Sequence, residues 1–180
     1  RRQRQMCIRD SPQTVPAAQL APADQRGQED WQLLLVNPWH TVPEGYEIKL
    51  ATLSNGLQVD ERIYDDLDDM LSDCREAGLN PIVCSAYRTE ATQTRLYRNK
   101  VARVRASGVP EDRVEAEAAR WVAKPGTSEH QTGLALDIVA AGYQILDEEQ
   151  EDTAEQKWLM ENSWKYGFIL RYPSEKSDIT

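Results

Sequence analysis

The sequence has little histidine, little cysteine and no excess of positive charge, and each shortage excludes a class of protein. Two of the 180 residues are histidine and three are cysteine, Cys7, Cys74 and Cys84. An odd number of cysteines without a Cys-x-x-Cys pair predicts neither a disulfide framework nor a thiolate metal site. Cys74 and Cys84 lie on apolar faces of predicted elements, which favours buried free thiols. The net charge of −9 lacks the basic excess that general binding to nucleic acid or anionic lipid requires.

Long apolar runs are also missing. No run of about 18 apolar residues occurs, so the sequence predicts no membrane-spanning helix. The first residues lack the apolar core of a signal peptide, so we expect any secretion signal or anchor to lie outside this chain. Residues 1–30 are rich in Gln, Pro, Ala and Arg without an apolar period, which predicts a disordered tail.

Residues 31–180 carry the pattern of one domain that is long enough to bury a substantial core. Apolar periodicity, capping residues and turn signals predict strands at 31–37, 81–88, 133–139 and 168–172. The same signals predict helices near 60–77, 90–106, 109–123 and 153–166. The irregular order of helices and strands predicts an α+β fold with a mostly antiparallel sheet flanked by helices.

The stretch "GTSEHQTGLALDI" at 126–138 places one of the two histidines seven residues before an aspartate. Imidazole nitrogen and carboxylate oxygen are both good zinc ligands. A separation of seven on one strand would put the two side chains on opposite faces. We therefore expect His130 in a loop and Asp137 on a strand, with a turn at Gly133 and small residues there and at Ala135 that let the backbone approach an ion. The residues alone leave open a loop histidine beside an unrelated aspartate.

The surroundings of this stretch resemble a known family. "SEHQTGLALD" fits the Ser-x-His-x-x-Gly-x-Ala-x-Asp pattern of the zinc D,D-carboxypeptidases that trim peptidoglycan stem peptides, and the similarity is to the VanY type. Four segments occur in that family's order and cover roughly residues 32–180: "LLLVN", "SAYRTEATQ", "KPGTSEHQTGLALDI" and "WLMENSWKYGFILRYP". The resemblance implies a Hedgehog/DD-peptidase-like fold and a Zn²⁺ cofactor.

The resemblance also implies a role for five residues. His130 and Asp137 match two of the three zinc ligands, and Arg88 matches the catalytic cation that stabilises the oxyanion forming at the scissile carbonyl. A guanidinium suits that role because it stays charged and donates to oxygen. Ser128 and Gln93 match substrate-binding residues, Ser128 at the terminal carboxylate of the peptide. The alternatives are a structural ion pair for Arg88, an exposed helix residue for Gln93 and a turn former for Ser128.

One element of the family pattern is missing. The family completes its site with a C-terminal Glu-x-x-His, in which the glutamate is the general base and the histidine is the third zinc ligand. This chain ends in "RYPSEKSDIT", and neither Glu175 nor any later histidine fits that element. We therefore expect a C-terminally truncated member that hydrolyses poorly. His40, in "NPWH", does not replace the missing ligand, because Asn37 stands in the glutamate position and cannot act as a base; we expect His40 to be a surface or packing residue.

The function implied by the resemblance is a zinc-dependent metallopeptidase that removes the C-terminal D-alanine from peptidoglycan stem peptides, in cell-wall remodelling and possible glycopeptide resistance. An L,D-carboxypeptidase or an endopeptidase of the same family is one alternative. A non-catalytic peptidoglycan-binding domain, with Arg88 and Ser128 as a carboxylate clamp, is another. The expected partner is a stem peptide ending in D-Ala-D-Ala, and the resemblance implies a monomer that is extracellular or associated with the cell envelope.

Overall fold

The structure is a computed structural model that describes residues 6–8 and 31–171. Four strands form an antiparallel sheet in the order β4–β5–β1–β6. They are β4 (Pro81–Ser85), β5 (Ala135–Ala140), β1 (Met6–Ile8) and β6 (Phe168–Leu170). A second antiparallel pair joins β2 (Leu50–Thr52) to β3 (Gln58–Asp60). The predicted α+β class with a mostly antiparallel sheet is confirmed.

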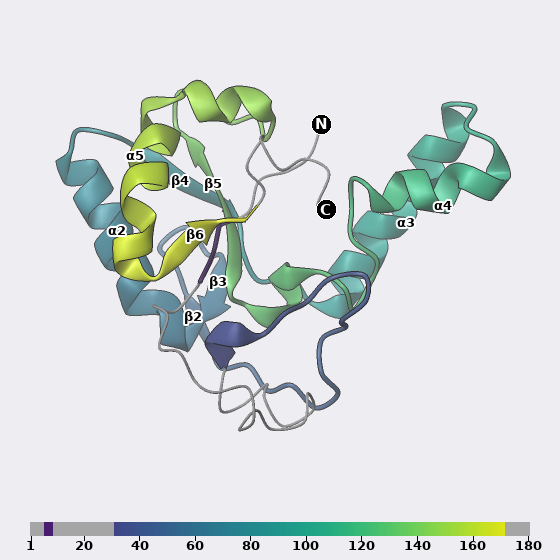
Figure 1. The fold of residues 1–180 in the computed structure, drawn as a ribbon, viewed down its shortest axis with the longest axis horizontal. Coiled ribbons are helices and arrows are strands. Elements are labelled where there is room, and N and C mark those ends of the chain that lie inside the picture. Colours follow the sequence, from purple (N-terminus) through teal and green to yellow (C-terminus); the bar gives the residue numbers. More distant parts are fainter. Residues whose placement is uncertain (1–5, 9–30, 172–180) are drawn as a thin grey trace, which may run out of the picture.

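Two helices pack on this sheet and two project away from it (Figure 1). Helices α2 (Tyr64–Glu76) and α5 (Ala154–Asn162) contact each other, and they contact β4 and β5 respectively. Helices α3 (Glu90–Ala106) and α4 (Glu111–Ala119) form a hairpin that extends from the far side of the body. Short 3-10 helices complete the elements: η2 (Trp31–Leu33), η3 (Glu61–Ile63), η4 (Glu129–Thr132), η5 (Glu148–Asp152) and η6 (Ser163–Tyr166). Among the described residues, no helix has both the length and the apolar character needed to cross a bilayer.

The helices begin close to the predicted positions, but α4 ends at Ala119 instead of 123, and α5 ends at Asn162, after which the chain continues as the 3-10 helix η6. The Thr89 side chain accepts a hydrogen bond from the backbone N–H of Thr92 at the start of α3, and the Thr153 side chain accepts one from Gln156 at the start of α5. Such caps satisfy backbone donors that have no partner inside a helix. The apolar residues of the 60–77 pattern are all buried: Ile63, Leu67, Met70, Leu71 and Cys74.

The strand predicted at 31–37 is wrong. The segment begins with η2, and Leu33 and Leu35 are 62% and 46% exposed. None of the described strands pairs with 31–37, and Asn37 instead forms an isolated bridge with His40. The disordered tail predicted for 1–30 does not hold for Met6–Ile8, which form β1; the rest of that segment lies outside the described residues.

The thiols agree only partly with the sequence prediction. Cys74 is free and buried, as expected, whereas Cys84 is free but exposed as a residue. Cys84 follows the alternation of β4, in which Pro81 and Val83 are buried, so its side chain leaves the apolar face of the strand. The side chain of Cys7 lies outside the described residues.

Candidate metal site

Three of the predicted site residues meet where β4, η4 and β5 come together. His130 lies in η4, Gly133 turns the chain with a left-handed φ of 73°, and Asp137 lies on β5, as the spacing predicted. His130 Nε2 is 3.3 Å from Asp137 Oδ2, and Arg88 Nη2 is 3.4 Å from the same oxygen. His130 and Asp137 are 1% and 0% exposed, so this contact is inside the protein.

The backbone carbonyl of Ala86 fixes the tautomer of His130. It therefore decides which ring nitrogen presents a lone pair to Asp137. His130 Nδ1 is 2.8 Å from the carbonyl oxygen of Ala86. A carbonyl oxygen can only accept a hydrogen bond, so Nδ1 must carry the proton and donate. In the neutral ring, Nε2 then has a free lone pair directed toward Asp137. The second hydrogen bond of a metal-binding histidine commonly sets its tautomer and orientation in this way.

A cation fits between these two side chains. His130 Nε2 and Asp137 Oδ1 are buried and have no hydrogen-bond partner. Buried acceptors without a donor are costly, and a metal ion removes that cost. Two ligands at about 2.0–2.1 Å from a tetrahedral zinc ion lie about 3.3–3.4 Å apart, and the observed Nε2–Oδ2 separation is 3.3 Å. The pair therefore has the chemistry and the spacing of two adjacent zinc ligands.

The described residues supply two ligands and no third. Within residues 6–8 and 31–171, no three His, Cys, Asp or Glu side chains gather in one group that could hold a metal. His40 is exposed, and its Nδ1 lies 3.0 Å from Asn37 Oδ1 in a tight turn closed by backbone hydrogen bonds between the same two residues. Glu175 lies outside the described residues.

Arg88 is held by a serine that the sequence reasoning missed. Arg88 Nε and Nη2 donate to Ser85 Oγ at 3.1 and 2.7 Å, and Nη2 also approaches Asp137. The ion pair proposed as the alternative role of Arg88 is therefore present. Burial lowers the pKa of the Arg88 guanidinium, and the charge of Asp137 opposes that shift. A guanidinium remains charged in proteins, so a fixed positive charge lies beside the two candidate ligands.

Cys84 contacts the backbone beside the site. Its Sγ lies 3.5 Å from the backbone carbonyl oxygen of Asp137, to which the thiol donates. Desolvation of the sulfur, together with the nearby negative charge of Asp137, raises the pKa of the Cys84 thiol to about 11. In the metal-free protein the Cys84 thiol is therefore protonated near neutral pH.

The two predicted substrate-binding residues occupy different positions. Ser128 is buried at the residue before η4, two residues from His130. Gln93 is fully buried on α3, where its Nε2 donates to the Ala123 carbonyl oxygen at 2.8 Å, while its Oε1 is buried without a hydrogen-bond partner. The exposed helix position considered as the alternative for Gln93 is thus wrong. Gln93 contacts the loop that leads toward η4, whereas Arg88, His130 and Asp137 contact one another.

Strand β3 ties the two halves of the site together, which no motif indicated. The Gln58 carbonyl oxygen accepts from Tyr87 N at 2.8 Å, and Asp60 N donates to the Gly133 carbonyl oxygen at 2.9 Å. Between these two contacts, Arg88 N donates to the His130 carbonyl oxygen at 3.0 Å. The hairpin β2–β3 therefore holds the segment with the arginine against the loop with the histidine.

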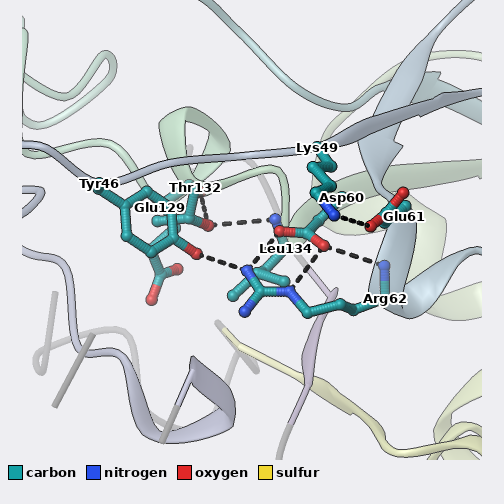
Figure 2. A network of polar contacts seen from close by, with 8 residues as sticks. All are labelled: Tyr46, Lys49, Asp60, Glu61, Arg62, Glu129, Thr132 and Leu134. Carbon is teal, nitrogen blue, oxygen red and sulfur yellow. Dashed lines mark hydrogen bonds and ion pairs between the residues drawn. The ribbon is translucent and has the colours of Figure 1, made fainter. Parts of the chain in front are cut away.

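The carboxylate of Asp60 anchors the end of this hairpin (Figure 2). Arg62 donates to it from Nε at 2.8 Å and from Nη2 at 2.5 Å, and Nη2 also donates to the Tyr46 hydroxyl at 3.1 Å. The Arg62 guanidinium lies 4.6 Å from the ring centroid of Trp31. Asp60 is buried, and a two-point pair with a guanidinium is the arrangement that makes a buried carboxylate tolerable.

Gly133 is needed for this contact between η4 and β3. A Cβ at Gly133 would lie 2.9 Å from Asp60 N, in addition to the strain of φ +73°. Gly126 has a similar φ of +82° but nothing within 4 Å of the same position, so it provides a matched control. We expect Gly126→Ala to lower the free energy of unfolding by about 1–2 kcal/mol through the left-handed conformation. Gly133→Ala is expected to cost a further 1–3 kcal/mol, roughly, through the backbone clash.

Urea unfolding of the two variants measures this difference. Equal losses for Gly126→Ala and Gly133→Ala would show that Asp60 does not constrain the Gly133 backbone.

Similarity to known proteins agrees with the geometry. A family model described as "VanY: D-alanyl-D-alanine carboxypeptidase" matches residues 56–180. A D-alanyl-D-alanine carboxypeptidase of Enterococcus faecalis is 44% identical over 162 residues, which cover 89% of this chain and 59% of the relative. The chain thus spans less than two thirds of that relative's length.

Two similar solved structures share the fold, each with a TM-score of 0.72 and 44% identity. One is a mutant of the vancomycin-resistance D,D-pentapeptidase VanY from a VanB-type resistance cassette in complex with Zn(II), and the match covers 83% of this chain and 82% of that chain. The other is VanYB in complex with D-alanine-D-alanine, with 83% and 80% covered. The expected Hedgehog/DD-peptidase fold is confirmed.

Proposed function

The chain belongs to the VanY family of D-alanyl-D-alanine carboxypeptidases, and on this basis we propose that it is a zinc peptidase that releases the terminal D-alanine of peptidoglycan stem peptides. Two observations of the same buried pair carry the proposal: His130 Nε2 and Asp137 Oδ1 have no hydrogen-bond partner, and Nε2 lies 3.3 Å from Asp137 Oδ2, the separation of two zinc ligands. Of the two similar solved structures, one is a complex with Zn(II) and the other a complex with D-alanine-D-alanine, which supports the same cofactor and substrate here. Such a substrate would place the protein at the cell envelope.

The proposed chemistry is hydrolysis of the last amide bond of the stem peptide. His130 and Asp137 would hold a zinc ion, which would supply Lewis-acid activation of the scissile carbonyl and of water. Within residues 31–171, Arg88 Nη1 has no hydrogen-bond partner, whereas Nε and Nη2 are fixed by Ser85 and Asp137. Arg88 is therefore positioned to donate to the carbonyl oxygen as it becomes negative. Ser128, on the loop that carries His130, would bind the terminal carboxylate, and the unpartnered Gln93 Oε1 would accept from the peptide.

We further propose that a Glu-x-x-His element completes the site. The sequence has no histidine besides His40 and His130, so it does not itself contain the element. A glutamate there would take the proton of the attacking water and pass it to the leaving amine. Without that base and the third ligand, residues 31–180 would form a domain that folds but turns over poorly.

The substrate test uses the chain supplied with such an element and loaded with zinc. We expect release of D-alanine from a pentapeptide ending in D-Ala-D-Ala to be faster, by about 10-fold or more in kcat/KM, than from a tetrapeptide ending in L-Lys-D-Ala. Chromatography of the products measures both rates, and the Asp137→Asn variant gives the background. The opposite preference would assign the protein as an L,D-carboxypeptidase. Binding of both peptides without cleavage would support the non-catalytic alternative.

A further inference from the structure

Two arginines of this protein lie beside buried carboxylates, and they present the same edge of the guanidinium to different acceptors. Arg62 donates from Nε and Nη2 to Asp60, at 2.8 and 2.5 Å, in a two-point ion pair (Figure 2). Arg88 donates from Nε and Nη2 to Ser85 Oγ, at 3.1 and 2.7 Å. Its contact with Asp137 is made by Nη2 alone, at 3.4 Å. A guanidinium beside a carboxylate commonly forms the two-point pair, so its absence at Asp137 requires a physical reason.

Burial does not explain the difference between the two arginines. The side chains of Asp60 and Asp137 are 1% and 0% exposed, and that of Arg88, at 15%, is less exposed than that of Arg62, at 30%. Opposite charges attract more strongly where less water surrounds them, so burial alone would favour the closer contact at Asp137. The serine explains the longer contact, because it occupies both nitrogens of the edge that would form the pair.

A β-bulge in β4 places this serine beside the aspartate. Val83 lies opposite Ile138 on β5, and Ser85 lies opposite Asp137. Two steps along β4 therefore match one step along β5, which makes Cys84 the extra residue of the bulge. Residues opposite each other in an antiparallel pair lie on the same face of the sheet. The bulge thus brings the Ser85 hydroxyl to the side of the sheet that carries the Asp137 carboxylate.

The carboxylate of Asp137 keeps its capacity to accept while Ser85 holds the arginine. Its Oδ1 has no hydrogen-bond partner, and its Oδ2 has only longer contacts, 3.3 Å to His130 Nε2 and 3.4 Å to Arg88 Nη2. If Arg88 turned its Nε and Nη2 from the serine to the carboxylate, both oxygens would accept from the guanidinium. The guanidinium would then compete with a metal ion for the same lone pairs.

We propose that Ser85 is a positioning residue of the metal site: by binding the Nε–Nη2 edge of Arg88, its hydroxyl prevents a two-point ion pair with Asp137 and leaves that carboxylate to the metal. The serine thereby lets a ligand and a cation lie side by side without neutralising each other. The benefit for metal binding rests on the proposed function. The choice of Arg88 between Ser85 and Asp137 does not, because it exists in the metal-free protein.

The crystal structure of metal-free Ser85→Ala tests this choice directly. We expect Arg88 Nε and Nη2 to lie within about 3.0 Å of the two Asp137 oxygens. The matched control is Ser107→Ala, which removes a hydroxyl that donates to the Val104 carbonyl oxygen at the far end of α3, and in which Arg88 should stay on Ser85. An arginine that keeps the 3.4 Å contact in Ser85→Ala, or that moves away from Asp137, would overturn the proposal without bearing on the peptidase assignment.

Calorimetric titration with zinc tests the consequence for the metal. We expect Ser85→Ala to weaken zinc binding about 10-fold or more, as the loss of outer-shell partners does. Ser85→Thr keeps the hydroxyl and should stay within about twofold of wild type. In an Arg88→Gln background, Ser85→Ala is expected to change the affinity by less than about twofold, because no guanidinium remains to pair with Asp137. Melting curves confirm that each variant folds.

The dependence on Arg88 separates positioning from a general effect on structure. Equal losses from Ser85→Ala in the wild-type and Arg88→Gln backgrounds would show that the serine acts on the fold and would overturn the proposal, as would unchanged zinc affinity of Ser85→Ala. Absence of zinc binding by the wild type would overturn the metal site itself, and with it the role of Ser85 there.

Discussion

Adding a segment with a Glu-x-x-His element after Thr180 is expected to raise the rate of D-alanine release by about 10²–10⁴-fold, the range in which a positioned general base contributes. The reason is that His130 and Asp137 already present two ligands, while neither the base nor a third ligand is among the described residues. The added histidine should also tighten zinc binding. Product release and competition with a chelating dye measure the two effects.

Two altered segments separate the base from the ligand. Gln-x-x-His should restore zinc affinity but little turnover, whereas Glu-x-x-Ala should restore neither fully. Equal rates for the unextended and the extended chain would show that the site does not need the element.

In the extended protein, His130→Ala is expected to lower zinc affinity by more than about 100-fold and to abolish D-alanine release. Loss of an outer-shell partner alone costs about 10–100-fold in metal affinity, so loss of the ligand itself should cost more. The Ala86 carbonyl directs the lone pair of His130 Nε2 toward Asp137. An alanine at position 130 has no side-chain nitrogen that could bind the metal.

His40→Ala is the matched control, because it removes the other histidine from an exposed turn. It should leave zinc affinity and turnover unchanged. Asp137→Asn, which keeps the shape of the side chain, should weaken zinc binding as His130→Ala does, and urea unfolding of the metal-free proteins shows whether each variant folds. If His40→Ala lowered zinc affinity and turnover as much as His130→Ala does, the metal ligand would be His40 and the proposed site would be wrong.

The candidate site follows from the sequence to different degrees. The placement of His130 in a loop, the turn at Gly133 and Asp137 on a strand was predicted from spacing, because alternation excludes a single strand that presents both side chains on one face. The motif placed Arg88 at the end of a strand over 81–88, but β4 ends at Ser85 and Arg88 follows it by three residues; its hydrogen bonds to Ser85 and Asp137 were not predicted. Serine and arginine in "SAYR" have many possible partners, and only packing of β4 against β5 selects these.

The sequence alone determined the main helices, strands β4, β5 and β6, and the two residues that present acceptors to a metal, because these depend on local periodicity, caps and short spacings. It missed β1, β2 and β3 and misplaced a strand at 31–37, since a strand forms only where another strand offers it hydrogen bonds. The tertiary structure decided which carbonyl fixes the His130 tautomer and why Gly133 must be glycine. Each of these depends on atoms brought together from distant parts of the chain.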